Sequence, residues 1–251
     1  MGQVRATSDI ATLLPPCVAL PAAADQLVAI ALPRAGLGLL GAIAAGYGWV
    51  VTHAATAFKA RQQVAQLPAG HLLAGPLPHD EEMVAALKGC RKLLLLRDLR
   101  SLLVSRLRAE RESGQRPELA PVWHLRNNAE QMCLFLGKRG PALFDEILAI
   151  LPWTCDPDCV VLHLDGLLQP DGAERRRIDD ILSQGLHRLY PQASPDTARR
   201  APPTPPLTPW RFADYWSDEA EAIFTAFGGP QMNRILGYEQ PAYSRAAIWP
   251  E

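Results

Sequence analysis

The sequence predicts an α/β protein, with a three-layer α/β/α fold around a central parallel sheet. Two short apolar runs of strand length, at residues 26–32 and 92–96, are each followed by a turn and then by apolar residues at helical spacing. Strands that alternate with helices in this way are typical of parallel sheets. With 251 residues, 48% of them hydrophobic, the chain is long enough to bury a full core. We therefore expect a single domain over residues 1–251, with a lead-in at 1–25 and a proline-rich loop at 191–209.

Composition and charge exclude several classes of protein. A formal net charge of −1 gives no overall field that would recruit nucleic acid or an anionic membrane. The apolar stretch 27–51 is interrupted by Pro33, Arg34 and several glycines, so we expect no membrane insertion. The five cysteines show neither a disulfide framework nor paired metal-ligand spacing, which indicates reduced thiols, no metal and a cytoplasmic location.

The first strand-to-helix junction predicts an anion site. Residues 26–32 form the predicted strand, Pro33 to Gly38 the turn, and a helix follows from about Leu39. In such a turn the backbone N–H groups and the helix dipole favour a bound anion. The turn is not a nucleoside-triphosphate P-loop, because that motif needs a lysine and a hydroxyl residue after its second glycine. A kinase or ATPase is therefore disfavoured.

The second junction predicts another anion-binding segment. The apolar run Lys92–Leu96 ends at Arg97 and Asp98, where helical spacing begins. The apolar positions of that helix share one face: Leu99, Leu102, Leu103 and Leu107. In open α/β sheets this junction lies at the carboxyl edge, where ligands bind, and an arginine beside a helix start favours an anion. The alternative is a solvated basic helix start without a ligand.

The rest of the chain is predicted to be mostly helical. Residues 42–66 are expected to be helical, residues 129–136 and 142–151 to form two helices separated at 137–141, and residues 159–168 to form a strand that runs into a turn. Another helix is expected to end near Leu189, and a last one to cover residues 215–227.

The second junction resembles the 3′-phosphate-binding segment of sulfotransferases that use 3′-phosphoadenosine 5′-phosphosulfate (PAPS). Bacterial members typically read R-D-P-R-D-x-x-x-S there. The matching residues of this chain are Arg97, Asp98, Arg100 and Ser105, whereas Leu99 and Ser101 depart from the pattern. The resemblance implies that Arg97 and Ser105 bind the 3′-phosphate.

The first junction resembles the 5′-phosphosulfate loop of the same family, which reads P-R-S-G-x-T in bacterial members. Pro33, Arg34 and Gly36 match, but the hydroxyl residues are absent. The resemblance therefore implies that the 5′ side is held mainly by backbone N–H groups, and that Arg34 also stabilises charge on the bridging oxygen as the sulfuryl group leaves. The implied cofactor-binding residues of this turn are Arg34, Ala35, Gly36, Leu37 and Gly38.

A third segment, Gly70-His71-Leu72, resembles the family's second-strand segment that carries a catalytic histidine. It lies between the other two segments, in the expected order. The resemblance implies that His71 takes the proton from the acceptor hydroxyl, and imidazole suits this task because it titrates near neutral pH. The alternative is a histidine at a strand end that forms local hydrogen bonds.

The C-terminal part keeps some family features and lacks others. Asp165 and Leu167 match the family's R-Y-E-D-L-L segment, and Leu164 replaces its tyrosine. The stretch from Trp210 to Glu239 is similar to the family's tail. The basic R-K-G element that closes over the 3′-phosphate is absent, and only Arg199-Arg200 lie near its place.

Together the resemblance covers about residues 27–239 and implies a P-loop-like sulfotransferase fold. The implied reaction moves a sulfuryl group from PAPS to a hydroxyl or amine of a small-molecule acceptor, releases adenosine 3′,5′-bisphosphate and needs no metal. The alternative is a sulfotransferase-fold protein with altered catalysis that serves as a nucleotide-binding or scaffolding module. The missing hydroxyls favour this alternative, and His71 argues against it. Another P-loop transferase would need a lysine that the turn lacks.

Overall fold

The computed structural model describes residues 26–54, 56–113, 123–169, 172–189 and 212–238, and every structural statement below concerns these residues. The predicted lead-in at 1–25 and the proline-rich loop at 191–209, with Arg199 and Arg200, lie outside them. The predicted tail is described only from residue 212 to 238.

The described strands form one parallel sheet in the order β2-β3-β1-β4-β5. The strands are β1 (Leu27–Ile30), β2 (Val50–His53), β3 (His71–Gly75), β4 (Arg91–Leu96) and β5 (Cys159–His163). Leu27 of β1 stands opposite Leu72 of β3 and Arg91 of β4. Every residue of β1 and β4 is buried, as expected for central parallel strands that are covered on both faces. The predicted central parallel sheet is thus confirmed.

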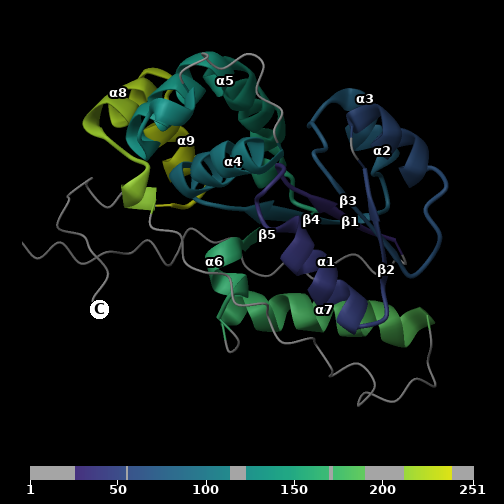
Figure 1. The fold of residues 1–251 in the computed structure, drawn as a ribbon. Helices are drawn as coiled ribbons and strands as arrows, with labels where there is room; N and C mark the ends of the chain where they lie inside the picture. Colours follow the sequence, from purple (N-terminus) through teal and green to yellow (C-terminus); the bar gives the residue numbers. More distant parts are fainter. Residues whose placement is uncertain (1–25, 55, 114–122, 170–171, 190–211, 239–251) are drawn as a thin grey trace, which may run out of the picture.

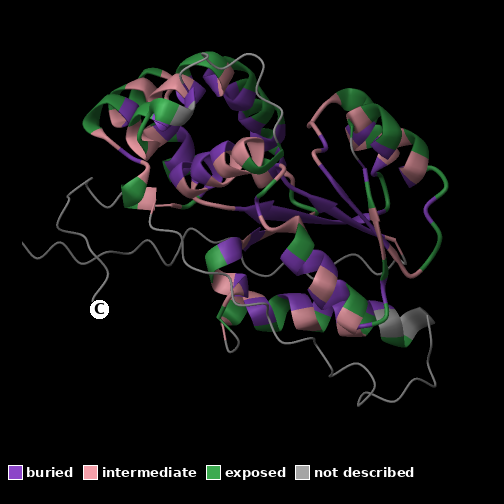
Figure 2. Cartoon of the chain, viewed as in Figure 1, coloured by how far each residue is buried: buried purple, intermediate pink, exposed green. Residues whose placement is uncertain are grey.

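Helices cover both faces of the sheet, which confirms the three-layer α/β/α arrangement (Figure 1). One face carries α1 (Leu37–Gly46), α6 (Leu164–Leu167) and α7 (Ala173–Leu189). The other face carries α2 (Ala57–Val64), α3 (Glu81–Ala86), α4 (Leu99–Ser113), α5 (Asn128–Ile150), α8 (Asp218–Ala226) and α9 (Gly229–Ile235). Short 3₁₀ segments are η2 (Trp123–Leu125), η3 (Leu151–Cys155) and η4 (Phe212–Asp214). Figure 2 shows buried residues concentrated in the sheet and on the helix sides that face it.

The single helical stretch predicted over residues 42–66 is wrong. Helix α1 ends at Gly46, β2 follows, and α2 begins at Ala57. Gly48 has a φ of 84° and reverses the chain after α1. The Trp49 indole then donates a hydrogen bond of 3.2 Å to the Leu182 carbonyl of α7, so the start of β2 is fixed by a contact that is distant in sequence.

The break predicted between two helices near residues 137–141 is also wrong. One helix, α5, runs through this segment with Pro141 inside it. Gly140 packs so closely against the Phe227 ring that an added Cβ would lie 2.7 Å from it. The Phe144 ring stacks on Phe227 with centroids 4.9 Å apart. This packing stabilises the helix although proline removes one backbone donor.

The order of the strands sets where ligands are expected. The chain leaves β1 toward the face of α1, whereas it leaves the two neighbours of β1, β3 and β4, toward the opposite face (Figure 1). In open α/β sheets this reversal opens a crevice at the carboxyl edge of the strands. None of the helices in the described part of the chain combines the length and apolarity that crossing a bilayer requires.

Candidate functional site

The turn after β1 presents the start of α1 at the carboxyl edge of the sheet. The Ala35 N–H donates to the Leu32 carbonyl at 3.0 Å, and Arg34 adopts a φ of 73°. Gly36 is the N-cap with a φ of 108°, and no side chain caps the helix. The first N–H groups of α1 therefore keep their hydrogen-bonding capacity, and the helix dipole adds positive potential there. The local geometry is that of an anion-binding turn.

Gly36 is required at this turn for two reasons. Its φ lies in the left-handed region, which side chains adopt at a cost. An added Cβ would also lie 2.5 Å from Leu164 Cδ1, because the first residue of α6 packs directly on the turn. Leu164, which replaces the tyrosine of the family pattern, thus packs its apolar side chain on the turn.

Arg97 joins the two predicted anion segments. It follows β4, the neighbour of β1, and its Nη1 donates a hydrogen bond of 2.9 Å to the Arg34 carbonyl. Within the described ranges Arg97 forms no ion pair. Burial lowers the pKa of its guanidinium, an effect opposed by the nearby Asp165 and Asp98 carboxylates. Arg97 remains a cation, since arginine stays protonated in proteins, and it has donors left for a ligand.

Ser105 lies on the side of α4 that turns toward Arg34. Leu99, Leu102 and Leu107 form the buried side of α4, whereas Ser105 is half-buried. Glu112 is seven residues after Ser105 and therefore on the same helix face. Its Oε2 lies 3.8 Å from Arg34 Nη2. Among the residues that the structure describes, no hydrogen bond joins Ser105 to Arg97.

An apolar crevice adjoins Arg97. Leu32, Leu96 and Leu99 line it together with Ile147 of α5, and Arg97 is the charged side chain in its wall. The space is large enough for only about one water molecule, and its wall is almost entirely apolar. Any contact of Arg97 with a ligand would therefore lie outside this space.

His163 lies at the same carboxyl edge of the sheet, at the end of β5. Its Nδ1 lies 2.6 Å from Glu174 Oε1, and its Nε2 lies 2.9 Å from the Leu236 carbonyl. Both partners are hydrogen-bond acceptors, an arrangement that favours the protonated imidazole, in which both ring nitrogens donate. The hydrogen bond to Glu174 raises the pKa of His163 against the effect of burial. Because both ring nitrogens have partners within hydrogen-bond distance, we assign His163 a structural role.

Two further groups shape the potential around Arg97. Burial raises the pKa of Asp165, and the Asp98 carboxylate raises it further, whereas Arg97 opposes the shift. The Tyr238 hydroxyl donates a hydrogen bond of 3.3 Å to the Leu96 carbonyl, next to Arg97, and burial raises its pKa. The Tyr238 ring also meets His163 edge-on, with centroids 5.3 Å apart.

The structure does not bring His71 together with the other predicted site residues. His71 is the first residue of β3 and stands opposite Val50, the first residue of β2. It therefore lies at the amino edge, about 13 Å along the strand from the carboxyl edge. The reason is local: Gly70 turns the chain at a φ of 78° immediately before the strand, so His71 begins β3 instead of ending it.

Several residues of the edge were not identified as site residues from the sequence. His163 carried a usable signal, because it ends a predicted strand that points to the same edge. Glu174, Asn233 and Tyr238 carried none, since their contacts depend on how distant segments pack.

Comparisons of the chain with protein-family models, with curated proteins and with solved structures find no match. The fold and the edge geometry define the class of the molecule: an α/β protein with a parallel sheet of order β2-β3-β1-β4-β5. Its candidate anion-binding turn follows the central strand at the point where the chain direction reverses.

Proposed function

We propose that this chain binds a 3′-phosphoadenosine nucleotide at the carboxyl edge of β1 and β4 and transfers the sulfuryl group of PAPS to a hydroxyl or amine of a small-molecule acceptor. The observation that carries the proposal is the hydrogen bond from Arg97 to the Arg34 carbonyl. It unites two segments, far apart in sequence, that each resemble a phosphate-binding segment of the PAPS-dependent sulfotransferases.

Each part of the site has a role in this proposal. The N–H groups at the start of α1 hold the 5′ side of the nucleotide in a P-loop-like manner. Arg97, with Ser105 on the neighbouring helix face, holds the 3′-phosphate. Arg34 stabilises the negative charge that develops on the bridging oxygen as the sulfur–oxygen bond breaks and the bond to the acceptor forms. Adenosine 3′,5′-bisphosphate leaves, and the proton of the acceptor passes to solvent, because His71 lies at the opposite edge of the sheet. Positioning and electrostatics supply most of the rate of such a transfer.

A nucleotide-binding module without catalysis is the second candidate. Two observations favour it: His71 lies at the opposite edge, and the turn after β1 has no hydroxyl side chain. Both candidates require the same nucleotide site. They differ in whether a sulfuryl group leaves PAPS when an acceptor is present.

The test is a calorimetric titration of adenosine 3′,5′-bisphosphate into the wild-type protein and into Arg97→Ala. Loss of a charge-assisted phosphate contact lowers affinity about ten- to a hundredfold. Arg126→Ala is the matched control, because Arg126 lies in an exposed pair with Glu130, 3.7 Å apart. It should bind as the wild type does. Absence of binding to the wild type would overturn both candidates.

A second measurement separates the two candidates. The protein is incubated with PAPS and a panel of phenols, alcohols and amines, and released adenosine 3′,5′-bisphosphate is measured. Release that depends on an acceptor and is lost in Arg97→Ala supports the transferase. Binding without release supports the module.

A further inference from the structure

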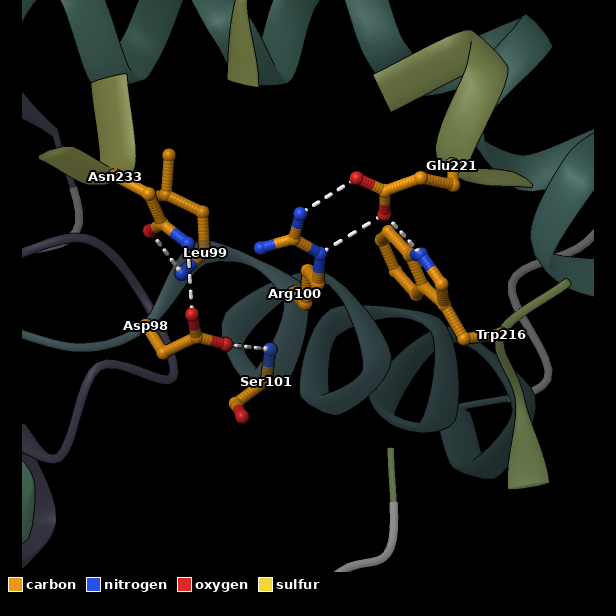
Figure 3. Close-up of polar contacts among 7 residues, drawn as sticks. All are labelled: Asp98, Leu99, Arg100, Ser101, Trp216, Glu221 and Asn233. Carbon is orange, nitrogen blue, oxygen red and sulfur yellow. Dashed lines mark hydrogen bonds and ion pairs between the residues drawn. The ribbon is translucent and has the colours of Figure 1, made fainter. Parts of the chain in front are cut away.

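Asn233 forms a polar bridge over the first turn of α4 (Figure 3). It belongs to α9 and is only 1% exposed. Its Oδ1 accepts the Leu99 N–H at 2.9 Å, and its Nδ2 donates to Asp98 Oδ2 at 2.7 Å. A buried amide that uses both its donor and its acceptor on adjacent residues fixes the backbone between them.

Asp98 completes this arrangement from its other side. Its Oδ1 accepts the Ser101 N–H at 2.8 Å, as an N-cap residue does. Asp98 and Asn233 together satisfy the Leu99 and Ser101 N–H groups, which have no acceptor inside the helix. The backbone from 98 to 101 is thus held by a three-bond network.

A second contact holds the same turn to α8 (Figure 3). The buried Arg100 donates two hydrogen bonds to Glu221, of 2.9 and 2.6 Å, and Trp216 donates to the same carboxylate at 2.7 Å. The Arg100 guanidinium also lies over the Phe224 ring, 4.6 Å from its centroid. This contact binds the side chain of residue 100, whereas Asn233 binds the backbone next to Arg97.

We infer that Asn233 is a positioning residue for the 3′-phosphate: it acts through Asp98 and the Leu99 N–H to fix where Arg97 leaves β4 and faces the turn after β1. The inference rests on the proposed nucleotide site and deepens it. Within the described residues the Asn233 amide bonds to Leu99 and Asp98, with no hydrogen bond to Arg97 itself. Its effect is therefore confined to the part of the affinity that the 3′-phosphate contributes.

The decisive quantity is the 3′-phosphate increment, defined as the ratio of the dissociation constants of adenosine 5′-phosphate and adenosine 3′,5′-bisphosphate. Asn233→Asp keeps the acceptor for the Leu99 N–H but faces Asp98 with a second carboxylate. Arg97 is displaced, and we expect the increment to fall about tenfold, while adenosine 5′-phosphate binds as before. A loss of folding would weaken both ligands alike.

A paired exchange tests the same bridge without changing net charge. In Asp98→Asn with Asn233→Asp, the amide at 98 donates to the carboxylate at 233, and the Leu99 and Ser101 N–H groups keep their acceptors. All three hydrogen bonds are restored, so the increment should return to within about threefold of the wild type.

Asp98→Asn alone keeps the test informative if Asn233→Asp does not fold. It removes a negative charge near Arg97, so an electrostatic role of Asp98 predicts tighter binding of the 3′-phosphate. It also breaks the bridge to Asn233, so positioning predicts weaker binding. A larger increment in this variant would overturn the inference.

Glu221→Gln is the matched control, because it weakens the attachment of α8 and leaves the bridge from Asn233 intact. Its increment should equal that of the wild type. An equal loss in Glu221→Gln and Asn233→Asp would overturn the inference, since general docking of the C-terminal helices would then explain both. If the increment is unchanged in Asn233→Asp, the inference about Asn233 is overturned but the proposed nucleotide site is not. If the wild type shows no increment, both are overturned.

Discussion

The two edges of the sheet hold their charges in different ways. At the amino edge, Lys92 Nζ lies 2.8 Å from Asp156 Oδ2, and the two side chains are only 7% and 10% exposed. The same ammonium lies 5.5 Å from the centre of the Trp153 ring. At the carboxyl edge, Arg97 donates to a backbone carbonyl and forms no ion pair within the described residues.

The difference separates a structural charge from one that is available to a ligand. A buried pair such as Lys92 and Asp156 is complete, and breaking it leaves an uncompensated charge. Among the described residues Arg97 has no carboxylate in an ion pair with it, and its hydrogen bond to the Arg34 carbonyl holds it beside the turn before α1. The amino edge therefore contributes stability, whereas the carboxyl edge is the place of the proposed nucleotide site.

The largest expected effect is on stability at the amino edge. Asp156→Ala leaves Lys92 buried without its partner, and we expect the free energy of unfolding to fall by about 3–5 kcal/mol. Arg97→Ala removes one hydrogen bond to a carbonyl and should cost about 1 kcal/mol. Urea denaturation measures both. Similar losses for the two variants would mean that the edges do not differ in this way.

A smaller effect is expected in the turn after β1. Gly36→Ala places a side chain at a positive φ and against Leu164, and should cost at least about 1–2 kcal/mol and weaken nucleotide binding. Gly38→Ala is the control, because Gly38 lies in α1 with no atom within 4 Å of an added Cβ. It should stabilise the protein by about 0.5–1 kcal/mol. Thermal unfolding that ranks the two variants in the reverse order would contradict this account of the turn.

The smallest effect is a pH dependence of stability at the carboxyl edge. The pKa of His163 is raised in the folded protein by the hydrogen bond to Glu174. Its contribution is therefore fully present below about pH 6.5, the usual range of histidine, and is lost as the pH rises through the folded pKa. His163→Gln should flatten this part of the profile of unfolding free energy against pH.

His71→Gln provides the control at the amino edge. The hydrogen bond of His71 runs from its backbone N–H to the Pro68 carbonyl, so replacing the ring leaves this bond in place. The variant should therefore unfold as cooperatively as the wild type. If His163→Gln leaves the profile of unfolding free energy against pH unchanged, the His163–Glu174 contact does not couple stability to pH.

The sequence predicts the centre of the fold better than its margins. The apolar runs that became β1 and β4 are buried on both faces, so composition alone identifies them. The edge strand β2 has only four residues, all exposed or half-buried, so its β-branched segment VVTH lacks the continuous apolar run that identified β1 and β4. Helix α5 continues through Pro141 because Gly140 packs on Phe227. The local sequence does not predict this contact.

For the candidate site too, the local sequence predicts some residues and misses those whose contacts are distant in sequence. Arg34 and Arg97 each follow a predicted strand, so the rule that parallel strands end at one edge brought them together. His71 was misplaced because a histidine next to a glycine does not reveal which end of a strand it occupies. Asn233 was missed because its partners are 134 and 135 residues away.

That separation along the chain has a consequence for biosynthesis. All five strands of the described sheet have been synthesised by residue 163, but Asn233, the partner of the Leu99 N–H and of Asp98, follows seventy positions later. Because chains emerge from the N-terminus and form distant contacts late, the sheet can assemble before the first turn of α4 acquires its last hydrogen bonds. A nascent chain that stops before α9 contains every strand of the described sheet. It lacks Asn233, which holds the backbone where Arg97 follows β4.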